Sequence, residues 1–287
     1  MTEKPIQTRI GRLNYIIEKL RQFGMKDSSR LMRMKEVLER GYIAPDDPDL
    51  QIALESMRDI HQLGLIVDTM ESSRGDAEFR QNLKHLPHDE VLPQDEQNTP
   101  GRDFQFQLYI AALCLNAGLK VKYGKSDVTC IVNGSTYVIE AKRVKGYKKL
   151  LGRVAEAAMQ ILEAGIPGII AIDLTIPRTK DIKLTTSRLL DGIHEMEADQ
   201  RKERYFQEHE NQLLDCVKGT GTLAVLVFES VVKRPQYKDR EHIVTRLWFH
   251  TTNGGLNAEK QLKELKVALK KCPNMNFTDH DIDLDES

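Results

Sequence analysis

The stretch SDVTCIVNGSTYVIEAK, residues 126–142, decides the fold because it predicts a tight β-hairpin. Asn133 and Gly134 are a strong signal for a two-residue turn, since both residue types tolerate positive φ. Apolar and β-branched residues flank the turn on both sides, as expected for two paired strands. A two-residue turn makes Val132 pair with Ser135, and this pair sets the register of the whole hairpin.

Two carboxylates and a lysine then gather on one face of the hairpin. Counting outward from the turn places Asp127 opposite Glu140, where facing Cβ atoms are roughly 4.5–5.5 Å apart. Like charges so close together repel each other, and a bound cation would remove the repulsion. Lys142 follows Glu140 by two residues, so the period of a strand returns it to the same face. A surface ladder of salt bridges is the alternative, but the apolar run before Glu140 is typical of a central strand.

Asp127, followed by the triplet Glu140-Ala141-Lys142, resembles the signature of the PD-(D/E)xK nucleases. The resemblance covers residues 102–175 and includes a helix before the hairpin and a helix–strand pair after it. The proline in the family's name is replaced by a serine. The fold that the resemblance implies is α/β (α+β), with a central mixed sheet flanked by helices in a restriction-endonuclease-like core.

The same resemblance implies a Mg²⁺-dependent phosphodiesterase, most simply a deoxyribonuclease, that leaves 5′-phosphate and 3′-hydroxyl ends. Asp127, Glu140 and the backbone carbonyl of Ala141 would bind Mg²⁺, with Mn²⁺ as a substitute, because hard cations prefer oxygen ligands. Lys142 would orient the attacking water and stabilise the negative charge that develops on the phosphate. Gln107 takes the place of a glutamate that family members commonly carry on the helix before the hairpin.

The helix predicted over residues 103–117 has two kinds of polar position. Helical spacing puts Gln105, Tyr109 and Asn116 together on one polar side. Gln107 falls among apolar residues, on the side that should face the sheet, where a buried amide needs hydrogen-bond partners. Gln107 is therefore predicted either to support the metal site or to be a satisfied core glutamine.

A basic segment follows the hairpin. Residues 142–153 contain no acidic side chain, and basic residues outnumber acidic ones over residues 99–180 although the chain has a net charge of −1. Because lysine and arginine contacts to phosphate dominate non-specific affinity for nucleic acids, this segment is predicted to bind the substrate backbone. The predicted nucleic-acid-binding residues are Arg143, Lys145, Lys148, Lys149 and Arg153. A solvated helix face is the alternative.

The chain divides into three parts by composition. Residues 1–98 are predicted to be a helical N-terminal region, residues 99–275 the nuclease core with C-terminal additions, and residues 276–287 an acidic disordered tail. His85 and His88 have a spacing that could bind metal, but two histidines in a polar loop are more often solvated.

Composition also restricts the compartment and the partners. The sequence has no apolar run of membrane-spanning length and no signal peptide, and its four cysteines lack metal spacing. We therefore expect no membrane association and a reducing cytoplasm. The resemblance implies a nucleic acid, in the first place DNA, as partner, and an effector of restriction or antiviral defence. Such an effector would act with a helicase or as a homo-oligomer. The alternative function is a catalytically silent nucleic-acid-binding or assembly subunit.

Overall fold

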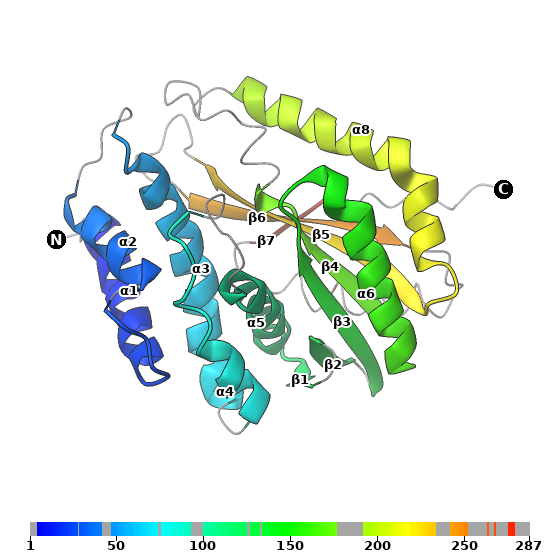
Figure 1. Cartoon of the computed structure of the whole chain (residues 1–287), viewed down its shortest axis with the longest axis horizontal. Helices are drawn as coiled ribbons and strands as arrows, with labels where there is room; N and C mark the ends of the chain where they lie inside the picture. Colours follow the sequence, from blue (N-terminus) through cyan, green and yellow to red (C-terminus); the bar gives the residue numbers. More distant parts are fainter. Residues whose placement is uncertain are drawn as a thin grey trace. The chain divides into compact units, whose positions relative to one another are not determined.

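The computed structural model describes most of the chain (Figure 1). The described residues are 5–27, 29–41, 47–73, 76–92, 100–124, 127–132, 134–176, 192–233, 242–251, 263, 267 and 275–278. They form two compact units, one built mainly from the chain up to Ala112 and the other mainly from the chain after it. Among the described helices, none combines the length and the apolar character needed to cross a bilayer.

The first unit is helical. Its elements are α1 (Pro5–Arg21), α2 (Arg30–Glu39), α3 (Leu50–Ser73), α4 (Ala77–Leu83) and the first three turns of α5 (Gly101–Asn116). Helices α1, α2 and α3 pack on one another. The apolar residues that their helical spacing places on one face, such as Leu13, Ile16 and Leu31, are fully buried between them.

The second unit contains a seven-stranded sheet whose strands lie in chain order. The strands are β1 (Lys120–Lys122), β2 (Val128–Val132), β3 (Ser135–Arg143), β4 (Gly168–Asp173), β5 (Thr222–Lys233), β6 (His242–Thr251) and β7 (Met275–Thr278). Strands β1, β2 and β3 are antiparallel neighbours, whereas β4 runs parallel to β3 and β5 runs parallel to β4. The predicted α+β class with a central mixed sheet is confirmed.

The hairpin between β2 and β3 has the register predicted from its turn. Val132 pairs with Ser135, and Val128 pairs with Ile139 at the other end. Gly134 has a φ of 86°, which a two-residue hairpin turn requires and a glycine adopts without steric strain.

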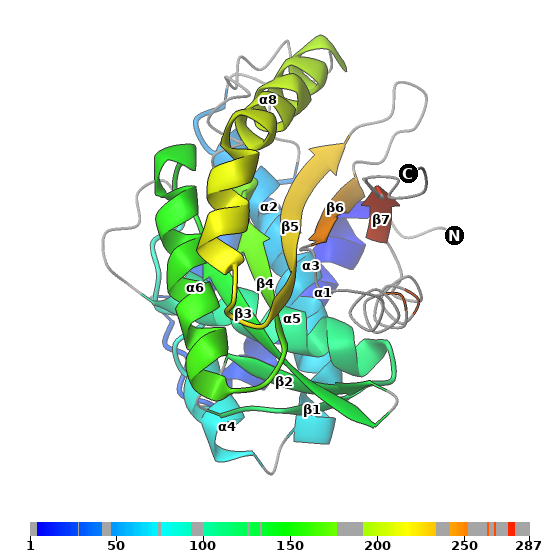
Figure 2. The ribbon, with the colours of Figure 1, turned by 90° about the vertical axis from the view of Figure 1, so that its right-hand side faces the viewer.

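Helices α6 (Leu150–Ala164) and α8 (Gly192–Val217) cover one face of this sheet (Figure 2). The 3₁₀ turn η1 (Tyr147–Lys149) leads into α6. The strand residues that pack against the two helices are Val138, Ile170, Ile172, Val225 and Val227. Because side chains alternate along a strand, Glu140 and Lys142 point to the same face as Val138.

The last turn of α5 lies on the opposite face. Cys114 of this turn and Cys130 of β2 are buried free thiols, 1% and 0% exposed. A hydrogen bond with the Cys114 thiol lowers the pKa of Cys130. Helix α5 therefore belongs to both units, with its first residues in one and its last turn in the other.

Gly168 begins β4 beneath α6, where a side chain has no room. A Cβ atom at this position would lie 2.7 Å from Cγ2 of Val138 and 2.8 Å from Cγ1 of Ile161. We expect Gly168→Ala to lower the free energy of unfolding by about 1–3 kcal/mol, because the added methyl group overpacks the core. Urea unfolding measures the difference. Gly152→Ala is the control for overpacking, because no atom lies within 4 Å of the Cβ added there. Equal stability of Gly168→Ala and wild type would contradict this account.

One predicted boundary needs correction. Residues 276–278 were expected to begin a disordered tail, but they belong to β7, which pairs in parallel with β6. These residues alternate between polar and apolar over too short a stretch to predict a strand, and the acidic residues that follow favour a disordered tail. Residues 279–287 lie outside the described residues.

Candidate active site

Asp127 and Glu140 face each other across β2 and β3. Asp127 immediately precedes Val128, whose partner is Ile139, so the next pair outward is Asp127 with Glu140. The backbone N–H of Ala141 donates a hydrogen bond of 2.8 Å to Oδ2 of Asp127. This bond holds the Asp127 carboxylate against the edge of β3, beside the Glu140 side chain.

Lys142 bridges the two carboxylates. Its Nζ lies 3.5 Å from Oδ2 of Asp127 and 3.5 Å from Oε2 of Glu140. The side chains of Lys142, Asp127 and Glu140 are 11%, 16% and 2% exposed. The hairpin thus brings these predicted residues into one cluster that is largely closed to water, which strengthens the interactions between their charges.

Burial raises the pKa of both carboxyl groups. Burial, followed by the charge of Asp127, raises the pKa of Glu140 from 4.5 to about 7, against the opposing effect of Lys142. Burial also raises the pKa of Asp127, while Lys142 and the Ala141 N–H oppose the change. Glu140 therefore gains or loses its proton close to neutral pH, and a cation between the carboxylates would favour the fully ionised form.

The raised pKa of Glu140 predicts a pH-dependent stability without metal. Between pH 4.5 and about 7 the folded protein holds a proton on Glu140 that the unfolded chain has already released. The site's contribution to stability is therefore present below pH 4.5 and is lost as the pH rises through 7. We expect the loss to be roughly 3 kcal/mol, and urea unfolding in EDTA across this range measures it.

Glu140→Gln is the control for this dependence. Glutamine keeps the shape of the side chain but does not titrate, so the variant should lack the fall in stability between pH 4.5 and 7. An equal fall in the variant and in wild type would assign the effect to other groups.

The donor atoms suit a hard cation with several water ligands. In an extended strand the N–H and C=O of one residue point to the same edge. The Ala141 carbonyl therefore shares its edge with Asp127, which accepts the Ala141 N–H. Two carboxylates and one carbonyl fit Mg²⁺, which keeps part of its hydration shell in proteins. Over the described residues no group of three or more His, Cys, Asp and Glu side chains could hold a metal ion, so the protein ligands of this site would be the two carboxylates and the carbonyl.

The predicted phosphate-binding residues are placed differently from one another. Lys145, Lys148 and Lys149 are exposed on η1 and the connection before it. Arg153 is exposed on α6 and donates to Glu156 at 2.7 Å. Arg143 is turned inward: its side chain is 6% exposed, and Nε lies 3.6 Å from Oδ2 of Asp173. In this arrangement Lys148 and Lys149 are more accessible to a phosphate backbone than Arg143 is.

The two glutamines of α5 exchange their expected environments. Gln105 was expected on a polar side, but it is 2% exposed and hydrogen-bonded to Arg30 and Asp59. Tyr109, expected on the same polar side, is also buried, with its hydroxyl 3.3 Å from Nε2 of His61. Gln107 was expected to be buried, but it is partly exposed. It belongs to the first unit, and its role beside the carboxylates stays a prediction.

Sequence reasoning missed two buried charged groups. Asp59 of α3 forms an ion pair with Arg30, and Nζ of Lys202 on α8 lies 3.6 Å from Oε1 of Glu229 on β5. Asp59 and Lys202 each lie on the apolar face of their helix. One turn after Asp59, for example, the same face of α3 carries the buried Leu63. A charged residue on an apolar helix face is the signal that could have indicated them.

The histidine pair does not form a metal site in the described structure. His85 stacks on Phe104, with ring centroids 4.7 Å apart and planes inclined by 19°. His88 donates its backbone N–H to the carbonyl of His85 in a turn. The ring of His85 is therefore part of the packing of the first unit rather than solvated as expected, whereas His88 is exposed.

Three comparisons with known proteins found no similar protein. No protein-family model matches the chain, and searches of curated proteins and of solved structures found no match.

Proposed function

We propose that this chain is a metal-dependent nuclease that hydrolyses phosphodiester bonds, with DNA as its substrate. The observation that carries the proposal is the convergence of Asp127, Glu140 and Lys142, with Nζ of the lysine 3.5 Å from each carboxylate. The order of elements also supports it. Helix α5, the antiparallel strands β1 to β3, helix α6 and the parallel strand β4 follow the sequence of elements expected from the PD-(D/E)xK resemblance.

The carboxylates and the Ala141 carbonyl would hold Mg²⁺, or Mn²⁺ in its place. When bound, the metal supplies Lewis acidity and lowers the pKa of a coordinated water. Lys142 donates hydrogen bonds to oxygen atoms at this position, and its charge stabilises the negative charge added to the phosphate in the transition state. The water oxygen bonds to phosphorus as the bond to the leaving oxygen breaks, and the ends expected are 5′-phosphate and 3′-hydroxyl.

Substrate binding would come from the exposed lysines. Strand β3, which carries Glu140 and Lys142, is followed closely in the chain by Lys145, Lys148 and Lys149. Each lysine that neutralises a phosphate releases counterions, which makes the affinity depend on salt but not on sequence. This pattern suits a nuclease that reads the backbone of its substrate.

Cleavage of single-stranded DNA, double-stranded DNA and RNA, each with Mg²⁺, Mn²⁺ or EDTA, tests the proposal. We expect cleavage of DNA with either metal and none in EDTA. Cleavage that persists in EDTA would contradict a metal-dependent mechanism. Binding of nucleic acid without cleavage in any condition would favour the catalytically silent binding or assembly subunit. A defence role with a helicase or a second copy as partner stays a prediction from the resemblance.

A further inference from the structure

Three aromatic rings lie side by side where α8 meets η1. The ring of Tyr205 lies on that of His209, with centroids 4.1 Å apart and planes inclined by 13°. Tyr205 also contacts Tyr147, with centroids 5.2 Å apart and planes inclined by 34°. The Tyr205 hydroxyl donates to the backbone carbonyl of Tyr147 at 2.9 Å, and Nδ1 of His209 donates to the backbone carbonyl of Tyr205 at 2.9 Å. These bonds fix the orientation of the rings, which we name the aromatic column.

The aromatic column reaches the surface among positive charges. Tyr147, Tyr205 and His209 are all partly exposed, whereas the neighbouring Phe206 is buried in the core. Tyr147 is followed directly by the exposed Lys148 and Lys149.

The face of α8 that carries the column has charges of both signs. Arg201 lies one helical turn before Tyr205, on the same face of α8, and is exposed. Glu208 lies seven residues after Arg201 and therefore points in nearly the same direction, so the positive charge beside the column comes from Lys148 and Lys149. Exposed rings interleaved with cations are the arrangement with which proteins bind single-stranded nucleic acids.

The column stands on the same face of the sheet as the carboxylates. Tyr147 and Tyr205 pack against the apolar core formed by α6, α8 and Val138. Glu140 and Lys142 point from β3 to this face, and η1 follows β3 closely in the chain. Tyr147 of the column and the exposed Lys148 and Lys149 therefore follow closely in the chain on the strand that carries Lys142.

We propose that the aromatic column is a stacking platform for an unpaired base of single-stranded nucleic acid, with the adjoining phosphates on Lys148 and Lys149. Every base has a π face, so the platform accepts bases of any sequence, while a duplex keeps its base faces stacked inside. The inference rests on the proposed function, because it supplies the substrate class of the same site.

Binding measurements test the platform separately from catalysis. Fluorescence anisotropy in EDTA compares a single-stranded oligodeoxynucleotide, an abasic strand of the same length and a duplex. We expect wild type to bind the base-bearing strand about tenfold more tightly than the abasic strand. His209→Ala should remove most of this difference, whereas Lys148→Ala should weaken the binding of both strands equally.

Two further variants separate stacking from other effects. His209→Phe keeps a ring and should retain the preference for bases, and Gln207→Ala, exposed on the same helix, should change nothing. Equal affinity of wild type for the base-bearing and abasic strands, absence of binding, or a full preference in His209→Ala would overturn the platform. A base preference without cleavage by wild type would support the platform and contradict the nuclease. Metal-dependent cleavage without a base preference would support the nuclease and contradict the platform.

Discussion

Glu140→Gln should reduce Mg²⁺-dependent cleavage about 10²- to 10³-fold, the loss typical when one group that stabilises charge in an active site is removed. The side chain is 2% exposed, so an isosteric replacement keeps its packing while removing the charge that would hold the metal. Lys142→Met should lower the rate by a similar factor, because the aliphatic part is kept and the ammonium group near both carboxylates is lost. Initial rates of cleavage of a labelled oligonucleotide measure both effects.

Metal binding distinguishes the roles of the two residues. Glu140→Gln should also lose affinity for Mn²⁺ in a calorimetric titration, whereas Lys142→Met should bind Mn²⁺ at least as well as wild type, because it removes a competing positive charge. Glu156→Gln is the matched control, since it changes an exposed carboxylate on α6 that pairs with Arg153. Cleavage by Glu140→Gln at the wild-type rate would remove this cluster from the mechanism.

The hairpin could be predicted because its determinants are local. Asn133-Gly134 favours the turn, and the alternation on each side places Asp127 opposite Glu140 by counting alone. The parallel neighbour β4 also follows from a strand, a helix and a second buried strand in succession. Each of these steps depends on residues that are close together in the sequence.

The surroundings of α5 could not be predicted in the same way. Apolar residues occur on nearly every side of this helix, so its spacing defines no single polar face for Gln105 and Gln107. Gln105 is the buried one because its amide forms hydrogen bonds with Arg30 and Asp59, which are far away in the sequence. For Arg143 the missing information was Asp173, whose pairing with it required the register between β3 and β4.

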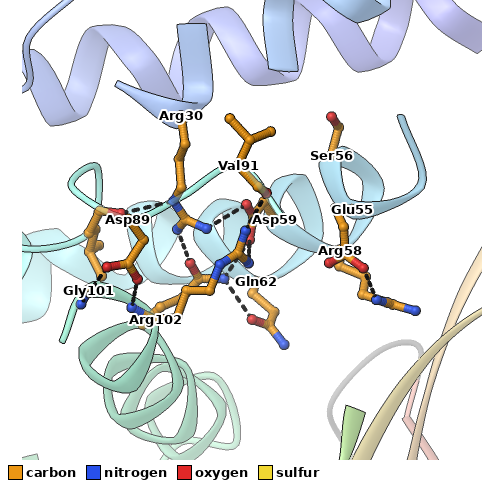
Figure 3. A network of polar contacts seen from close by, with 12 residues as sticks. Arg30, Glu55, Ser56, Arg58, Asp59, Gln62, Asp89, Val91, Gly101 and Arg102 are labelled. Carbon is orange, nitrogen blue, oxygen red and sulfur yellow. Dashed lines mark hydrogen bonds and ion pairs between the residues drawn. The ribbon is translucent and has the colours of Figure 1, made fainter. Parts of the chain in front are cut away.

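Asp59→Ala should lower the free energy of unfolding of the first unit by about 3–5 kcal/mol, because it leaves buried cations without their counterion. Figure 3 shows Arg30 and Arg102 converging on Asp59. Nη1 of Arg30 lies 2.8 Å from Oδ2 of Asp59, and the two side chains are 0% and 1% exposed. Nη1 of Arg102 lies 3.4 Å from Oδ1, to which Gln105 also donates at 2.8 Å.

Urea unfolding followed by circular dichroism measures this loss, with Asp68→Ala as the matched control. Asp68 lies on the same helix and pairs with Arg12, but this pair is 48% and 35% exposed. An exposed ion pair contributes about 0–1 kcal/mol, so the control should be close to wild type. A loss below 1 kcal/mol for Asp59→Ala would contradict the assignment of Asp59 as the counterion of the buried network.

Removing a cation together with the carboxylate should recover only part of the loss. The double variant Arg30→Met/Asp59→Leu replaces both members of the buried ion pair by apolar side chains. Such a replacement is often neutral or stabilising when the buried pair is isolated. Arg102 remains, and its Nη2 still donates to the carbonyl of Val91 at 2.8 Å. The double variant should therefore be more stable than Asp59→Ala and less stable than wild type. Full recovery would mean that Asp59 serves Arg30 alone, whereas partial recovery would show that it joins α2, α3 and α5 through both arginines.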